Sequence, residues 1–122
     1  MANPFVHVEL HTGDLARAKD FYSRLFDWKL DDLPAPGGEM PYTLIDVGEG
    51  TGGGMAACPK DQAPRWLAYV AVDDIEAATR KARELGATVL QDVTEVGGYG
   101  WLSVIRDPTG AEIAMWKPRL DT

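Results

Sequence analysis

Two histidines and a glutamate alternate near the start of the chain, as His7, Glu9 and His11. The residues between them, Val8 and Leu10, are apolar, and this alternation is typical of a strand with one apolar and one polar face. Imidazole and carboxylate groups transfer protons near neutral pH and also bind metal ions. The pattern therefore predicts a polar strand face that carries Glu9 as a candidate general base and His7 as its partner.

A repeat sets the order of the elements that position these residues. The segment VHVELHTGDL at residues 6–15 returns sixty residues later as LAYVAVDDIE at residues 67–76. Apolar spacing predicts helices at 15–26 and 75–85, capped by Asp14 and by Asp73 or Asp74, with Gly86 after the second. A loop is expected at 34–38, and one strand is expected to begin at residue 28. The other strands are expected at 6–10, 42–47, 54–58, 66–72, 89–91, 101–106 and 112–117.

Each half of the chain thus reads as strand, helix and three strands. The sequence predicts an α+β fold in a single domain, 1–122, with βαβββ modules at 5–58 and 65–118 and a linker at 59–64. One helix covers only one face of the sheet in each module. We therefore expect the two modules to join and to enclose a cavity between their open faces.

Composition narrows the classes of partner. The chain has 122 residues, with 19 acidic against 12 basic side chains and a net charge of −7, and it lacks the basic cluster of a nucleic-acid-binding protein. The longest apolar run, at 66–72, is too short to span a membrane, and the N-terminus lacks the pattern of a signal peptide. With one cysteine, Cys58, no internal disulfide is possible. We expect a cytoplasmic protein that binds neither nucleic acid nor membrane.

Three segments together resemble the vicinal oxygen chelate superfamily, which includes glyoxalase I, extradiol dioxygenases and the fosfomycin and bleomycin resistance proteins. They are VHVELHTGDLARAKDFYSRLFDW, YVAVDDIEAATRKARELGA and WLSVIRDPTGAEIAMWKP. The resemblance implies tandem βαβββ modules that form a U-shaped eight-stranded sheet around a cavity, with a helix packed behind each half. It also implies a homodimer.

The resemblance further implies one inward metal ligand from each of strands one, four, five and eight. Carried over by the repeat, those positions are His7, Met55, Leu67 and Ala114. A catalytic zinc ion needs about three protein ligands, and only His7 qualifies. No metal cofactor is therefore predicted, and metal-dependent isomerisation or extradiol cleavage is disfavoured. A displaced divalent-metal site made of His7, Glu9 and Glu112 is the alternative.

Strand alternation predicts which side chains line the cavity. The expected ligand-binding residues are His7, Glu9, Met55, Leu67, Tyr69, Ala114 and Trp116. The facing of Tyr42 and Trp101, on neighbouring strands, is not fixed by the sequence. Such an aromatic and partly acidic lining suits an organic ligand held by stacking and apolar contact.

Three functions remain from the sequence. The first is binding of a small aromatic or cationic molecule by a family member that lacks the usual metal ligands. The second is an enzyme, a lyase or isomerase related to lactoylglutathione lyase, that acts on a carbonyl compound. It would be metal-free or use a displaced metal, with Glu9 and His7 as its catalytic pair. The third is a structural or regulatory interaction module.

Overall fold

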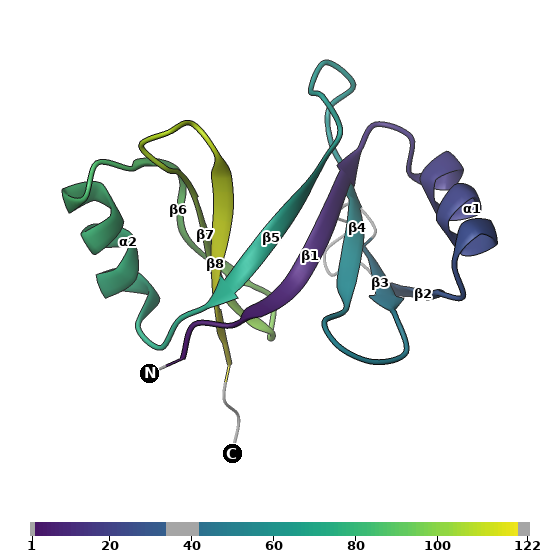
Figure 1. Ribbon diagram of the computed structural model, residues 1–122, viewed down its shortest axis with the longest axis horizontal. Helices are drawn as coiled ribbons and strands as arrows, with labels where there is room; N and C mark the ends of the chain where they lie inside the picture. The colour runs from purple at the N-terminus through teal and green to yellow at the C-terminus, as the bar shows by residue number, and fades with distance from the viewer. Residues whose placement is uncertain (1, 34–41, 120–122) are drawn as a thin grey trace. The chain divides into compact units, whose positions relative to one another are not determined.

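The computed structural model describes residues 2–33 and 42–119, where eight strands and two helices follow the predicted order (Figure 1). The first set is β1 (Phe5–Thr12), α1 (Leu15–Leu25), β2 (Lys29–Leu33), β3 (Tyr42–Asp46) and β4 (Gly53–Ala57). The second is β5 (Arg65–Ala71), α2 (Ile75–Glu84), β6 (Thr88–Val96), β7 (Gly100–Arg106) and β8 (Glu112–Pro118). The α+β class with two βαβββ modules is confirmed. The loop predicted at 34–38 lies outside the described residues.

Two compact units divide the chain close to this repeat. One comprises residues 7–67, and the other comprises residues up to Val6 together with those from Ala68 onward. The first two residues of β1 thus belong to the second unit, and the first three residues of β5 belong to the first.

The unit of residues 7–67 has the strand order β2-β3-β4-β1, in which β1 runs parallel to β4 and the other neighbours are antiparallel. Helix α1 covers one face of this sheet. Leu10, Ile45 and Met55 are buried there, and partly buried apolar side chains, Leu15, Ala18 and Tyr22 of α1 among them, pack on this cluster. Burial of these side chains is the main force that holds α1 on the sheet.

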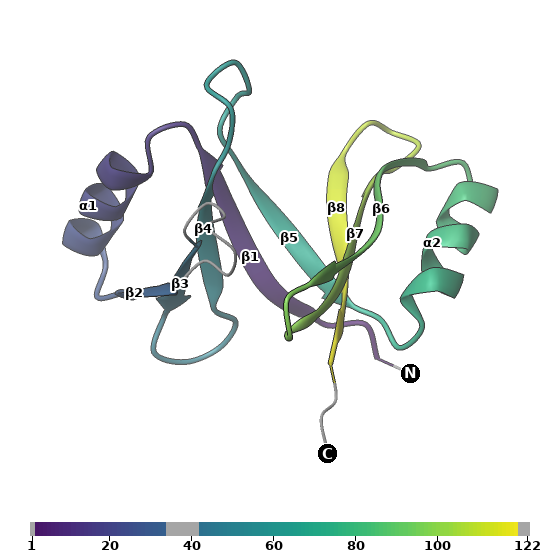
Figure 2. The ribbon, with the colours of Figure 1, turned by 180° about the vertical axis from the view of Figure 1, so that it is seen from behind.

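The other unit has the order β5-β8-β7-β6, with β5 parallel to β8. Figure 2 shows α2 beside the strands β6, β7 and β8. Thr79 of α2 and Ser103 of β7 are buried and joined by a hydrogen bond of 2.9 Å between their hydroxyl oxygens. Helix α2 is thus fastened to its sheet by a buried polar contact as well as by apolar packing.

The helix ends match the sequence signals. The carboxylates of Asp14 and Asp74 accept hydrogen bonds from the backbone N–H groups of Arg17 and Ala77, which selects Asp74 over Asp73 as the second cap. Gly86 follows α2 with φ of +102°, a left-handed conformation that glycine adopts readily. Within the described ranges, neither helix is long and apolar enough to cross a membrane.

Strand β6 differs from its prediction. The sequence indicated a short strand at 89–91, whereas β6 extends from Thr88 to Val96, with register shifts after Val89 and after Gln91. It is the last strand in the order of its sheet and most of its side chains are exposed, so the apolar alternation that marks a strand is missing. The predicted length was therefore wrong.

Candidate functional site

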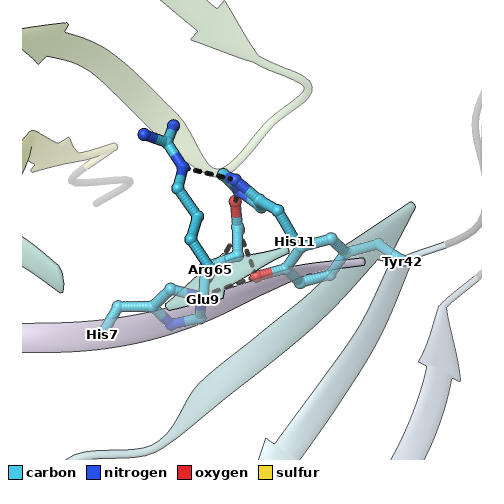
Figure 3. A network of polar contacts seen from close by, with 5 residues as sticks. All are labelled: His7, Glu9, His11, Tyr42 and Arg65. Atoms are coloured by element: carbon cyan, nitrogen blue, oxygen red, sulfur yellow. Dashed lines mark hydrogen bonds and ion pairs between the residues drawn. The ribbon is translucent and has the colours of Figure 1, made fainter. Parts of the chain in front are cut away.

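Polar side chains gather on the face of the β2-β3-β4-β1 sheet that is opposite to α1. This face, which we call the polar face, carries His7, Glu9, His11, Tyr42 and Arg65 (Figure 3). Because successive side chains of a strand point to opposite faces, the burial of Leu10 against α1 directs its neighbours on β1 to the polar face. The predicted polar face of the first strand is thus present.

Glu9 is at the centre of the polar face. Its Oε2 accepts a hydrogen bond of 2.6 Å from the Tyr42 hydroxyl, and its Oε1 accepts one of 2.6 Å from Nε2 of His11. Only 13% of the Glu9 side chain is exposed, against 26% for His7 and 21% for His11. The carboxylate is therefore mostly withdrawn from solvent and has a hydrogen-bond donor at each oxygen.

The hydrogen bonds around Glu9 continue on both sides. Nε2 of His7 lies 2.6 Å from the Tyr42 oxygen. Because the Tyr42 hydroxyl donates to Glu9, His7 takes the role of donor to that oxygen. On the other side, Nε–H of Arg65 donates to Nδ1 of His11 over 3.4 Å. The network thus runs from His7 through Tyr42, Glu9 and His11 to Arg65.

The network keeps Glu9 in its charged form. Burial alone would raise the pKa of this carboxyl, but the hydrogen bonds from His11 and Tyr42, together with the nearby His7 imidazole, outweigh burial and hold the pKa of Glu9 well below its usual range. A carboxylate stabilised in this way binds protons weakly. Its arrangement suits electrostatic and hydrogen-bonding roles better than proton abstraction.

A glycine makes room for Tyr42. Gly54 on β4 is the register partner of Glu9 on β1, and a Cβ atom added to Gly54 would overlap the hydroxyl and ring of Tyr42. Glycine inside a strand often marks the close approach of another group. Glycine at position 54 of β4 therefore leaves the space that the Tyr42 side chain occupies.

Met55 does not lie where the repeat placed it. The sequence predicted that Met55 shares the inner face with His7 and Glu9. In the structure it is fully buried in the cluster with Leu10 and Ile45, on the α1 side of the sheet. The repeat is out of step by one residue at β4, and a one-residue shift moves a side chain to the other face.

The predicted residues of the second module share a face of their own sheet. Tyr69 is the register partner of Ala114, and the rings of Tyr69 and Trp116 meet edge to face with centroids 6.5 Å apart. Tyr69 and Ala114 are buried. Leu67, also buried, lies two residues before Tyr69 on β5 and points to the same side of that strand.

Trp101 lies elsewhere. It lines a cleft of about 550 Å³ with residues of α2 and β6, namely Glu76, Thr79, Arg80, Arg83, Asp92, Val93 and Glu95. The Arg119 guanidinium stacks over the Trp101 ring at 4.7 Å and pairs with Glu95. The cleft contains acidic and basic side chains in similar number and none of the predicted ligand-binding or catalytic residues.

The residues present do not fit a metal of the family type. Of the four carried-over positions, Met55 is on the α1 side, Leu67 and Ala114 offer no donor atom, and His7 is hydrogen-bonded to Tyr42. Glu112 of the displaced-site alternative pairs with Arg106 at 3.0 Å. Over residues 2–33 and 42–119, no three His, Cys, Asp or Glu side chains are grouped so that they could hold a metal ion.

Two members of the network are not among the site residues predicted from the sequence. Arg65 precedes Leu67 by two residues on the same strand, so strand alternation places the two on the same side. The sequence does not fix the facing of Tyr42, whereas its register with Ala56 of β4 places it on the polar face. The sequence signal for the position of Tyr42 is Gly54, because a glycine inside a strand often marks the close approach of another group.

Comparison with known proteins agrees with this architecture. Residues 5–115 match the model of the Glyoxalase/Bleomycin resistance protein/Dioxygenase superfamily. The putative glyoxylase CFP32 of Mycobacterium bovis is 37% identical over 90% of this chain and 44% of its own length. The anthracycline biosynthesis protein DnrV of Streptomyces peucetius is 28% identical over 89% of this chain and 45% of its own. The chain thus spans less than half the length of these relatives.

Solved structures share the fold at low sequence identity. A methylmalonyl-CoA epimerase from Mycobacterium tuberculosis superposes with a TM-score of 0.71 and 17% identity, over 95% of this chain and 88% of that one. A hypothetical protein from Bacillus halodurans gives a TM-score of 0.75 with 12% identity, over 100% and 99% of the two chains. Likeness at this level of identity concerns the fold alone.

Proposed function

This chain belongs to the Glyoxalase/Bleomycin resistance protein/Dioxygenase superfamily, and from that premise we propose that it binds a small aromatic or cationic organic molecule at the polar face, without a metal ion. The polar contacts to the ligand come from His7, Glu9 and Tyr42. The exposed parts of the two histidine rings are the route by which a ligand reaches the network.

The charged, mostly buried carboxylate of Glu9 is the observation that carries this proposal. Removing a carboxylate from water costs free energy unless hydrogen bonds compensate for it, and Tyr42 and His11 supply them here. A titratable group with a strongly shifted pKa is a candidate for a functional site. An apolar side chain would serve the stability of this sheet without that cost.

The shape and charge of the polar face indicate the ligand class. The rings of His7 and Tyr42 are nearly parallel, with an interplanar angle of 21° and centroids 6.3 Å apart, so a flat aromatic molecule can stack on them. Glu9 contributes a negative charge in a chain of net charge −7, which favours cations. The name of one relative, an anthracycline biosynthesis protein, also supports a ligand with fused aromatic rings.

An anthracycline is a suitable probe because it combines fused aromatic rings with an amine. Isothermal titration calorimetry should detect binding to the wild-type protein, and Tyr42→Ala should weaken it about tenfold, since the variant loses both a stacking surface and a hydrogen bond. Glu9→Gln should weaken it by a similar factor through loss of the charge. Trp101→Ala, which alters the cleft beside α2, is the matched control and should leave the affinity unchanged.

Two results would contradict the proposed site. Equal affinity in the wild-type protein, Tyr42→Ala and Glu9→Gln would remove the polar face from ligand binding. A loss of affinity only in Trp101→Ala would assign the ligand to the cleft beside α2 instead.

The alternative function is a metal-free lyase or isomerase with Glu9 as base and His7 as its partner. The lowered pKa of Glu9 weakens it as a base, which counts against this role. The relatives named putative glyoxylases are the reason to test it. Turnover of the hemithioacetal of methylglyoxal that falls at least about a hundredfold in Glu9→Gln would favour the enzyme over the binding protein.

A further inference from the structure

The Tyr42 hydroxyl occupies the space between two atoms that are good metal ligands. Nε2 of His7 and Oε2 of Glu9 are 3.8 Å apart, and the Tyr42 oxygen is 2.6 Å from each. Bonds from a zinc ion to imidazole nitrogen and carboxylate oxygen measure about 2.0–2.2 Å. Two such bonds together exceed the separation of the two atoms, so a divalent ion could bridge them if the hydroxyl were absent.

We propose that Tyr42 is the specificity-determining residue of the polar face, because its hydroxyl takes the place of a divalent metal ion between His7 and Glu9 and reserves this pair for an organic ligand. The hydroxyl accepts a hydrogen bond from His7 and donates one to Glu9, so it satisfies both groups without a charge of its own. An ion would have to displace Tyr42 and break both hydrogen bonds.

Gly54 allows the Tyr42 hydroxyl to lie between His7 and Glu9. The Tyr42 side chain extends over β4 above Gly54, where any larger residue would overlap its ring and hydroxyl. Gly54 also pairs in register with Glu9, so a side chain at this position would itself point at the network. Position 54 and the Tyr42 hydroxyl therefore compete for one space, and glycine leaves that space to the hydroxyl.

His11 would support an ion in the absence of Tyr42. It donates to Oε1 of Glu9, the oxygen that does not face His7, and thereby orients the carboxylate. Hydrogen bonds of this kind around a ligating carboxylate commonly raise metal affinity. The pair of His7 and Glu9 offers two protein ligands, so water must complete the coordination and the affinity gained will be modest.

The test uses metal ions alone. Zn²⁺ binding is measured by titration calorimetry, and Co²⁺ binding by its absorption spectrum, for the wild-type protein, Tyr42→Ala and the double variant Tyr42→Ala/His7→Ala. We expect Tyr42→Ala to bind Zn²⁺ about tenfold or more tightly than the wild-type protein does. The gain should vanish in the double variant, whose remaining binding measures adventitious surface sites.

Either of two results would overturn the inference. If the wild-type protein binds Zn²⁺ through His7 as tightly as Tyr42→Ala does, the hydroxyl excludes nothing. If Tyr42→Ala binds no better than the double variant, His7 and Glu9 do not form a latent metal pair. Tyr42→Leu, which keeps an apolar side chain on the sheet but removes the hydroxyl, provides the same comparison should Tyr42→Ala fail to fold.

A double-mutant cycle tests the competition between positions 42 and 54 separately. Gly54→Ala should lower the melting temperature sharply in the wild-type background and much less in the Tyr42→Ala background. Gly98→Ala is the control, because no atom lies within 4 Å of the added Cβ and its φ is not left-handed. Additive effects of Gly54→Ala and Tyr42→Ala would contradict the shared space. That the pair is reserved for an organic ligand rests on the proposed function, but none of these measurements involves such a ligand, so failure of metal exclusion is distinguishable from failure of the proposed function.

Discussion

The polar face is organised around a single carboxylate. Glu9 receives donors from two different directions, Tyr42 on β3 and His11 on its own strand. Arg65 on β5 in turn fixes the orientation of the His11 ring by donating to its Nδ1. A network in which each group has a partner is rigid, and rigidity lets a binding site present its polar atoms to a ligand without a large loss of entropy.

The lowered pKa of Glu9 makes a prediction about stability and pH. The carboxyl titrates at 4.5 when unperturbed and below that value in the folded protein, so its stabilising contribution is present above about pH 4.5 and is lost as the pH falls below it. At pH 7, Glu9→Gln should lower the free energy of unfolding by about 1–3 kcal/mol, because charge-assisted hydrogen bonds are lost. Urea unfolding of both proteins between pH 7 and pH 3 measures the difference.

The difference between wild type and Glu9→Gln should shrink as the pH falls below 4.5, because the unfolded wild-type chain then takes up a proton at Glu9 that the folded protein binds only at lower pH. Glu84→Gln, the same change at an exposed position on α2, is the control. Its free energy of unfolding should equal that of the wild-type protein at pH 7 and at lower pH. A gap that stays constant over the whole range would mean that the charge of Glu9 does not stabilise the fold.

At the scale of residues, the sequence predicted part of the site. Alternation on β1 was enough to group Glu9 with its neighbouring histidines, since it depends on one strand only. The positions of Tyr42 and Met55 depend on how β3 and β4 align with β1, and register is set by packing and turn geometry that no single strand encodes. Met55 was placed by counting along a repeat and ended on the wrong face.

At the scale of elements, the two helices are the best-predicted parts of the chain. Their apolar spacing and aspartate caps are local signals, and both helices begin where those signals placed them. The exposed edge strand β6 was predicted much too short because exposure removes the alternation that marks strands. Helix α2 also contains a buried polar contact that sequence periodicity had no means to show.

The buried hydrogen bond between Thr79 and Ser103 couples α2 to its sheet, and its contribution to stability can be measured. The Thr79 hydroxyl donates to the carbonyl of Ile75, so Ser103 donates to Thr79. Thr79→Val should lower the free energy of unfolding by about 1–3 kcal/mol, because the buried Ser103 hydroxyl loses its acceptor. Adding Ser103→Ala should restore part of that loss, as measured by chemical denaturation.

Thr88→Val is the control for this pair, because Thr88 is exposed at the start of β6. Its effect should stay within about 0.5 kcal/mol. If Thr79→Val and Ser103→Ala prove additive, the hydroxyl groups contribute separately and the hydrogen bond between them does not fasten the helix.

At the scale of the whole molecule, the repeat predicted two modules, and the chain indeed contains two βαβββ sets. The boundaries of the compact units do not coincide with those of the modules, however, because they lie inside β1 and β5. β1 and β5 each contribute residues to both units. Unfolding of either unit therefore removes ordered residues from strands that the other unit uses.

This sharing predicts a single unfolding transition for the molecule. Trp28 and Trp66 report on residues 7–67, and Trp101 and Trp116 report on the other unit. Replacing either pair with phenylalanine leaves fluorescence from one unit only, and the midpoint of urea unfolding measured by fluorescence should equal that measured by circular dichroism in each variant. Thr79→Val directly weakens only the unit that contains α2. Added to each of these variants, it should shift the urea midpoint reported by Trp28 and Trp66 as much as the midpoint reported by Trp101 and Trp116. A shift confined to Trp101 and Trp116 would show instead that the two units unfold independently despite their shared strands.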